Sequence, residues 1–346
     1  MKKFKTVLVL VVFVVFFVSL FMCYDCVAKG VTSGLYLCAN VIIPSLFPII
    51  CLTSFFINTG VATSLGSCFN SFCKKVFNSS GCFLPVFLIS LVSSYPIGSL
   101  LSNSLYENKK ISLCERNNIA LVSCSAGPSF VILAVGVNIL GSFECGIFLY
   151  CCHILSSITI ALVVSRLFKY NSDFSACENK ISVGDALVKG VSAGASSIIS
   201  ICAYTVLFSA IINVLSSYLR FSPFFLPIIS TLEVTNACVV LSLEKVPLSV
   251  ISAVLGFGGF SIIFQVSSCL KHNPPPISTI VLVRFFHAVL SYIYCEIALK
   301  IFDISVPVIK NVTPVLKTSS YNFLFSLSLM FLLVVFLSFL NKSTEK

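Results

Sequence analysis

The sequence predicts an all-helical membrane protein that crosses the bilayer several times, built from two inverted repeats with re-entrant hairpins or broken helices. Two observations predict this fold class. Hydrophobic residues make up 58% of the 346 residues and charged residues only 10%, which leaves too little polar surface to cover a soluble globule. In addition, long apolar runs recur along the chain, and four of them are interrupted near their middles by proline, glycine or polar residues.

Charge and cysteine content argue against other classes of protein. The formal net charge is +10, but the basic residues are spread over short segments between apolar runs, where they orient the chain in the membrane rather than bind nucleic acid. Most of the 17 cysteines lie singly inside apolar runs, where cysteine behaves as a small hydrophobic residue. Only Cys23 and Cys26 have metal or redox spacing, without a second pair or a nearby histidine.

The apolar runs are interpreted as membrane segments because about 20 apolar residues are needed to cross a bilayer. The first run, at 4–22, resembles a signal sequence, but it is long and lacks a small-residue cleavage pattern. We therefore expect an uncleaved membrane helix there. The other runs lie near 32–57, 82–105, 119–141, 143–165, 190–217, 222–243, 247–270, 277–300 and 321–340.

The run at 82–105 is expected to enter the membrane and return as a hairpin. Lys74 and Lys75 precede it and further basic residues follow it, so both flanks are predicted to be cytoplasmic. The Ser-Tyr-Pro-Ile-Gly stretch at 94–98 would form the tip, because proline removes a backbone donor and glycine permits a turn. Exposed backbone at that depth is stable only against protein or a water-filled cavity.

Three further runs are interrupted in a similar way, at 125–129, 232–236 and 256–259. A discontinuous helix has unpaired N–H groups at one broken end and unpaired carbonyls at the other. Such ends bind anionic substrate groups and coupling cations respectively. Single serines in membrane helices usually bond to their own backbone, and glycines usually permit close packing. Four interruptions together nevertheless favour a cavity.

A polar, cytoplasmic linker at 166–189 divides the chain into two similar halves. An N-terminal anchor helix is predicted at 1–29 and the first repeat at 30–165. The second repeat is predicted at 190–300, and a loop with a C-terminal membrane helix at 301–346.

The two halves resemble each other weakly. Residues 34–56 align with 190–212 without a gap, and two interrupted runs follow in each half. If the first repeat enters from outside and the second from inside, the repeats are inverted, as in many secondary transporters. Lys310 and Lys317 count against this topology, because they would lie on the outer side.

Glu233 is the first candidate for function because it lies near the middle of an apolar run. An ionisable side chain at bilayer depth costs about 2.5–3.5 kcal/mol, so it normally faces a partner, a cavity or a substrate. The functional interpretation is contact with the substrate or with a coupling proton. The structural alternative is a pair with Arg284 or His287, and Arg284 is itself suited to an anionic solute.

We expect no catalytic residue, no metal ligand and no enzymatic activity, because no nucleotide-binding, nucleophile or metalloprotease motif is present. No cofactor is expected other than a coupling proton or sodium ion. His153 and His272 are interpreted as locally bonded or loop residues. The candidate substrate-binding residues belong to the interrupted runs, with one added cation: Ser94, Tyr95, Pro96, Gly98, Ser125, Gly127, Pro128, Ser129, Glu233, Thr235, Asn236, Gly256, Gly258, Gly259, Ser261, Gln265 and Arg284.

At these positions the sequence resembles the YlbJ/SpoVV family of sporulation integral membrane proteins, which belongs with the nucleoside-recognition or Gate-domain membrane proteins. It departs from the family pattern at Ser94, where glycine is usual, and at Ser123 and Cys124, where asparagines are usual. The resemblance covers roughly residues 30–300, and the matching segments occur in order at 44–48, 94–98, 126–130, 135–136, 232–236 and 256–265.

This resemblance implies a fold similar to that of concentrative nucleoside transporters. It also implies a protein of endospore-forming bacteria, located in the cell membrane or the outer forespore membrane and associated with movement of dipicolinic acid toward the spore. The carboxylates of that planar dianion would suit helix N-termini, hydroxyls and Arg284. A nearby Glu233 would then have to be protonated or paired with a cation.

The predicted function is therefore secondary transport of a small anionic solute, with dipicolinic acid as the first candidate. The alternative is a non-transporting membrane scaffold for spore maturation or cortex assembly, but the longest polar loop, 166–189, offers little docking surface. A membrane enzyme or lipid flippase would need a catalytic constellation that the sequence lacks. The expected partners are the solute, the lipid bilayer and further copies of the chain, without nucleic acid.

Overall fold

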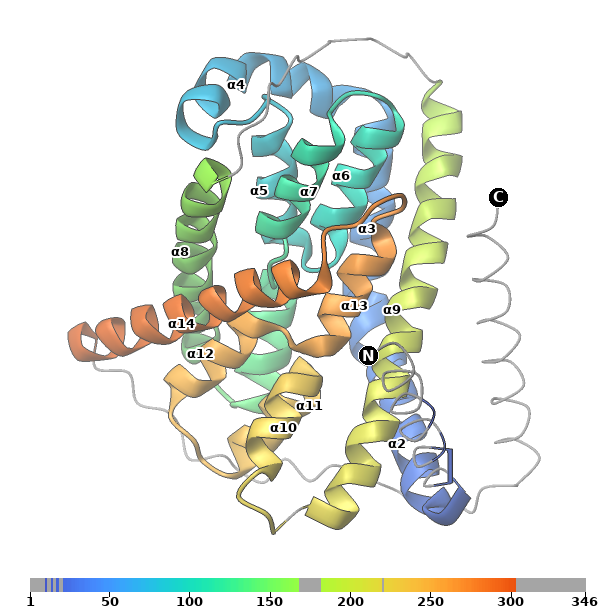
Figure 1. Ribbon diagram of the computed structural model, residues 1–346, viewed down its shortest axis with the longest axis vertical. Helices are drawn as coiled ribbons and strands as arrows, with labels where there is room; N and C mark the ends of the chain where they lie inside the picture. Colours follow the sequence, from blue (N-terminus) through green and yellow to red (C-terminus); the bar gives the residue numbers. More distant parts are fainter. Residues whose placement is uncertain are drawn as a thin grey trace. The chain divides into compact units, whose positions relative to one another are not determined.

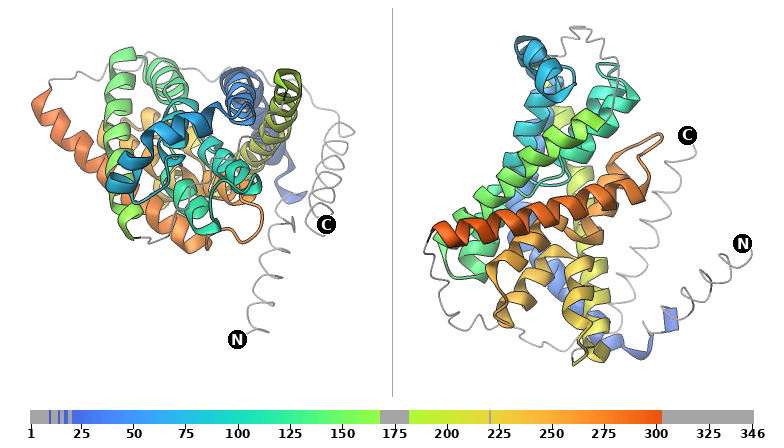
Figure 2. Two further views of the ribbon diagram at one scale, coloured as in Figure 1. Left: turned by 90° about the horizontal axis from the view of Figure 1, so that it is seen from above. Right: turned by 60° about the vertical axis from the view of Figure 1, so that its left-hand side comes forward.

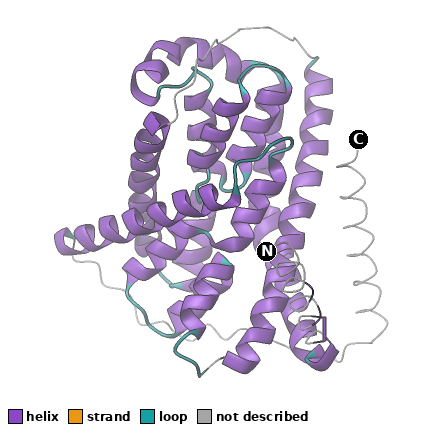
Figure 3. Ribbon diagram, in the orientation of Figure 1, coloured by secondary structure: helices purple, strands orange, loops and turns teal. Residues whose placement is uncertain are grey.

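The computed structural model describes residues 21–167, 182–219 and 221–302, with four isolated positions before residue 21. This part of the chain consists of helices joined by turns and short connections (Figure 3). The helices, labelled in Figure 1, are α2 (Tyr24–Leu37), η1 (Cys38–Ile42), α3 (Ile43–Asn58), α4 (Val61–Phe77), α5 (Phe83–Ser93), α6 (Ile97–Glu107), α7 (Leu113–Val122), η2 (Ser129–Ile139), α8 (Phe143–Leu167), α9 (Val183–Leu219), α10 (Phe225–Leu232), α11 (Val234–Leu243), α12 (Leu248–Phe257), α13 (Gly259–Cys269) and α14 (Ile277–Ile301).

Within the described residues, four segments are long and apolar enough to cross a membrane: α8, α9, α14 and the pair α12–α13 at Leu248–Cys269. Their outward side chains include many large hydrophobic residues, such as Leu282 and Phe285 on α14, which is expected where a helix faces lipid. The helix α14 runs across α8 and α12 (Figure 2). The protein is a multi-pass integral membrane protein.

The helices α2, η1 and α3 follow one another directly, and α9 packs along them (Figure 1). η1 is a π-helical turn that precedes Pro44, which has no N–H group to continue a regular helix. Glycines permit the close approach of α9 at both ends of this contact. A Cβ added at Gly34 would lie 2.7 Å from the Cα of Val206, and one added at Gly190 would lie 2.9 Å from the carbonyl oxygen of Cys51.

The predicted hairpin at 82–105 is present as α5 and α6. The turn covers 94–96 and α6 begins at Ile97. Two contacts with α7, together with the short connection from Glu107 of α6 to Leu113 of α7, show that the chain reverses there. Ser80, just before α5, donates its N–H to Glu115 in the first turn of α7 at 2.6 Å, whereas a Cβ added at Gly98, at the start of α6, would lie 2.4 Å from the Cβ of Ser123, at the end of α7.

The other three predicted interruptions are also present. α10 and α11 pack against each other, so the chain folds back at Glu233. The helices α7 and η2 are separated by residues 123–128, and α12 and α13 by Gly258 alone, which has a φ of +80°. Only glycine adopts such a φ readily.

Several helix boundaries differ from the predicted apolar runs because capping, not hydrophobicity, starts the helices. Ser182 accepts the N–H of Asp185 at 3.1 Å, so α9 begins at Val183, inside the predicted linker 166–189. Ser112 accepts the N–H of Glu115 at 3.2 Å, so α7 begins before the predicted run at 119–141. Both are N-caps of the usual kind.

The amphipathic helix α4 was not predicted, because it is shorter and more polar than a membrane span. It exposes Leu65, Phe69 and Phe72 and ends with two lysines. α2 begins at Tyr24, so the predicted boundary between an anchor at 1–29 and a repeat at 30–165 falls inside a helix. Most of the run at 4–22, the whole of the run at 321–340 and all but the start of the segment at 301–346 lie outside the described residues.

The glycine contacts lead to a test of the α2–α9 packing. Gly34→Leu should lower the melting temperature of the purified protein by several degrees, because overpacking costs about 1–3 kcal/mol. Unfolding can be followed in detergent with a thiol-reactive dye, since many cysteines are buried. Gly184→Leu is the matched control, because the nearest atom to an added Cβ there is 4.0 Å away. Equal melting temperatures for the two variants would contradict the packing.

Candidate functional site

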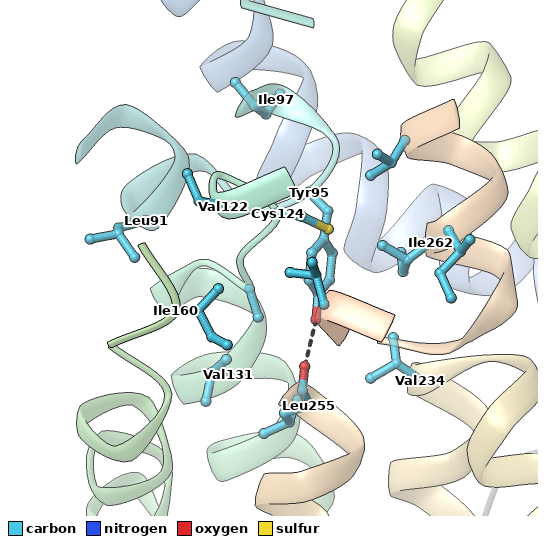
Figure 4. Close-up of a cluster of buried hydrophobic side chains, with 14 of the residues drawn as sticks. Leu91, Tyr95, Ile97, Val122, Cys124, Val131, Ile160, Val234, Leu255 and Ile262 are labelled. Atoms are coloured by element: carbon cyan, nitrogen blue, oxygen red, sulfur yellow. Dashed lines mark hydrogen bonds between the residues drawn. The ribbon is translucent and has the colours of Figure 1, made fainter. Parts of the chain in front are cut away.

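The four helix breaks meet at one buried junction. The hydroxyl of Tyr95, in the α5–α6 turn, donates to the carbonyl oxygen of Leu255 near the end of α12 at 3.1 Å (Figure 4). A Cβ added at Gly127 would lie 2.8 Å from the backbone nitrogen of Ser94, and one added at Gly259 would lie 3.1 Å from that of Glu233. Each break is therefore in contact with another.

Arg284 of α14 lies at the centre of this junction and is 1% exposed. Its ε nitrogen donates to the carbonyl of Phe257 at 3.0 Å. Its two terminal nitrogens donate to four further acceptors: the carbonyls of Cys124, Leu255 and Gly256, and Nδ1 of His287 at 2.9 Å. A guanidinium group has five N–H donors, so every one has a partner.

These acceptors explain where the positive charge is placed. The last four carbonyls of a helix have no partner within the helix, and this end carries a partial negative charge. At the end of α12, the N–H of Gly258 donates to the carbonyl of Val254. Arg284 donates to the carbonyls of the next three residues, Leu255, Gly256 and Phe257. The carbonyl of Cys124 lies just beyond α7. Arg284 therefore caps two broken helices, one from each half of the chain.

Glu233 binds the N-terminal, positive end of a helix, α11. Its carboxylate oxygens accept the backbone N–H groups of Thr235 at 2.9 Å and of Asn236 at 2.8 Å, and the side-chain amide of Asn236 at 2.7 Å. Glu233 is 3% exposed and forms the N-cap of α11. A carboxylate at a helix N-terminus is stabilised by the unpaired N–H groups and the helix dipole.

The proposed structural pair is not formed. Among the described residues, Glu233 makes no ion pair or hydrogen bond with Arg284 or His287. The physical reason is that each charge is already compensated by the broken end of a helix. Arg284 likewise has no donor left for a solute in this conformation, so the sequence-based interpretation of a direct contact with an anion does not describe this state.

A histidine pair extends the junction between α8 and α14. The rings of His153 and His287 stack with centroids 4.7 Å apart. Nε2 of His153 accepts the N–H of Ala126 at 2.9 Å and lies 3.0 Å from the hydroxyl of Ser125. The hydroxyl of Ser157 lies 3.2 Å from that of Ser125 and 3.3 Å from Nε2 of His287.

The donors fix the tautomers of this pair. His153 must carry its proton on Nδ1, because Nε2 accepts a backbone N–H. His287 must carry its proton on Nε2, because Nδ1 accepts from Arg284. The sequence predicted only a local role for His153. A signal was available, since both histidines lie within apolar membrane segments, but their proximity required the fold.

Several predicted site residues lie around the junction in other roles. Asn236 also donates to the hydroxyl of Ser209 on α9 at 3.1 Å. Gln265 donates to Ser261 on α13 at 3.2 Å, while its carbonyl oxygen is buried without a partner. Gly256 permits the close approach of α14, because an added Cβ would lie 2.8 Å from the Cα of Ala288.

Three of the helix N-termini at the breaks, those of α6, η2 and α13, have no side-chain cap. The hydroxyls of Ser99 in α6 and Ser129 at the start of η2 are buried without hydrogen-bond partners. No group of three or more histidine, cysteine, aspartate or glutamate residues in the described segments is arranged to hold a metal ion.

Comparison with known proteins supports only part of the predicted resemblance. Over 132 residues the chain is 27% identical to the sporulation integral membrane protein YlbJ of Bacillus subtilis strain 168. This alignment covers 38% of the chain and 32% of YlbJ, so the chain matches about a third of the length of this curated relative. No family model matches, and no solved structure is significantly similar. The inverted repeats, the Gate-domain relationship and the likeness to concentrative nucleoside transporters remain predictions.

Proposed function

We propose that the protein is a secondary transporter of a small anionic solute in a sporulating cell, with dipicolinate as the first solute to test. The observation that carries this proposal is the meeting of four broken helices, two from each half, at one buried junction. Secondary transporters build their binding sites from such discontinuous helices near the bilayer midplane.

The charges at the junction favour an anion. Arg284 neutralises the negative ends of α7 and α12, and Glu233 neutralises the positive end of α11. The uncapped N-termini of α6, η2 and α13 remain, together with the carbonyl ends of α5 and α10, so the remaining positive helix ends outnumber the negative ones by three to two. Helix N-termini bind carboxylates through backbone N–H groups and the helix dipole. The unpartnered hydroxyls of Ser99 and Ser129 supply further donors.

Transport would require the junction to open on each side in turn. Tyr95 is 4% exposed and Glu233 3% exposed, so the described conformation corresponds to a closed state. The hairpins α5–α6 and α10–α11 are the elements proposed to move. The contacts of Gly34 with α9 and of Gly190 with α3 support the predicted internal repeat instead, because the two glycines occupy aligned positions in its two halves.

Uptake into vesicles tests the transport proposal. Purified protein in liposomes should accumulate labelled dipicolinate when a proton or sodium gradient is imposed. Ser129→Ala should reduce uptake about tenfold, because loss of one hydrogen bond to a charged group costs roughly 1.5 kcal/mol. Ser196→Ala is the matched control, since that exposed hydroxyl bonds only to the carbonyl of Ser192 on its own helix.

Two outcomes would contradict the proposal. A reconstituted protein that moves neither dipicolinate nor other small carboxylates or nucleosides would favour the scaffold alternative. Unchanged uptake by the Ser129→Ala variant would remove the binding role proposed for the N-terminus of η2.

A second comparison separates the capping role of Glu233 from a role in transport. Glu233→Gln removes the charge and one of the two acceptor oxygens of the α11 N-cap, and Ser112→Ala removes the α7 N-cap, so each should destabilise the protein by about 0.5–2 kcal/mol. Ser112 caps α7 at a distance from the junction. Measured per folded molecule, uptake should fall strongly only for Glu233→Gln. Equal uptake by the two variants would show that Glu233 is a cap alone.

A further inference from the structure

We propose that Arg284 is a tethered cation that takes the place of a mobile coupling metal ion, so that the transporter works without sodium. The inference about uptake rests on the function proposed above. The inference about stability rests on the contacts of Arg284 alone and is tested independently.

Arg284 occupies carbonyl ligands that a coupling cation would need. In discontinuous membrane helices, the exposed carbonyls of unwound segments and helix C-termini coordinate sodium ions or protons. The carbonyls of this kind beside Arg284 are those of Cys124 after α7 and of Leu255, Gly256 and Phe257 at the end of α12. All four accept hydrogen bonds from the guanidinium of Arg284.

The positive charge of Arg284 is compensated by dipoles. Arg284 is 1% exposed and forms no ion pair with any described carboxylate, so carbonyl dipoles compensate its charge. The ring of Tyr95 adds to this compensation, because the guanidinium carbon lies 5.7 Å from its centroid. A bound metal cation would depend on the same dipoles. The two cations would therefore compete for one site, and the covalently attached one is always present.

Arg284 also links the two halves of the chain. The contacts of Arg284 join the first half of the chain, through Cys124 and Tyr95, to the second half, through α12 and α14. Removal of the guanidinium would leave the buried carbonyls without hydrogen-bond donors. It would also leave a cavity of the size and shape of a guanidinium group. Free guanidinium ions should fill that space, and sodium ions should gain access to the same carbonyls.

The experiment uses the full chain purified in detergent. Replacing sodium by choline at constant ionic strength should leave the melting temperature of the unmodified protein unchanged. Arg284→Ala should lower the melting temperature by about 10 °C, because the removal of a buried charge leaves its partners unpaired. Guanidinium chloride at low millimolar concentration should restore at least half of that loss, and sodium should also raise the melting temperature of this variant.

Two further variants serve as controls. Arg284→Lys keeps the charge, so its melting temperature should fall less than that of Arg284→Ala and should not respond to guanidinium or sodium. If Arg284→Ala does not fold, the melting temperature of Arg284→Lys is compared with that of the unmodified protein. Arg116 is equally buried and donates to the carbonyls of Lys271 and Asn273, in the turn between α13 and α14. Arg116→Ala should be destabilised without gaining a response to sodium, because no helix break lies there.

Two results would overturn the inference. One is a sodium-dependent melting temperature, or sodium-dependent uptake, in the unmodified protein. The other is an Arg284→Ala protein that responds neither to guanidinium nor to sodium. A protein that moves no solute but shows the expected melting temperatures would contradict the proposed function. The proposal that Arg284 replaces a bound metal cation would still hold.

Discussion

Breaking a helix inside a membrane leaves carbonyls and N–H groups without partners, and the described structure depends on how these groups are satisfied. An unpaired polar group in hydrocarbon costs several kcal/mol. Here the carbonyl ends of α7 and α12 bind the guanidinium of Arg284, and the N–H end of α11 binds the carboxylate of Glu233. The two buried charges are stable because each faces a helix end of opposite sign.

This arrangement couples the two halves of the chain. Arg284 binds a carbonyl from the first half and three from the second, and Tyr95 shares one of these acceptors, Leu255. The stacked histidines continue the network between α8 and α14. A movement of either hairpin would change contacts at the other breaks, which is what the proposed transport requires.

The sequence predicted features that are set locally and missed those that depend on distant backbone. All four breaks were predicted, because proline, glycine or polar residues cluster there near the middle of apolar runs, whereas single residues of these kinds, such as Pro48 in α3 and Gly190 in α9, lie within unbroken helices. The helix α4 was missed because it lacks a long apolar run. The roles of Arg284 and Glu233 could not be predicted, since their partners are backbone carbonyls and N–H groups, which every residue has. The proximity of His153 and His287 required the packing of α8 on α14.

The most direct measurement is an experimental density map of the full chain that resolves side chains around Gly258. The account predicts the guanidinium of Arg284 between the carbonyl of Cys124 and the last carbonyls of α12, with the carboxylate of Glu233 on the first N–H groups of α11. A map in which α12 and α13 form one unbroken helix, or in which Arg284 faces lipid, would contradict it.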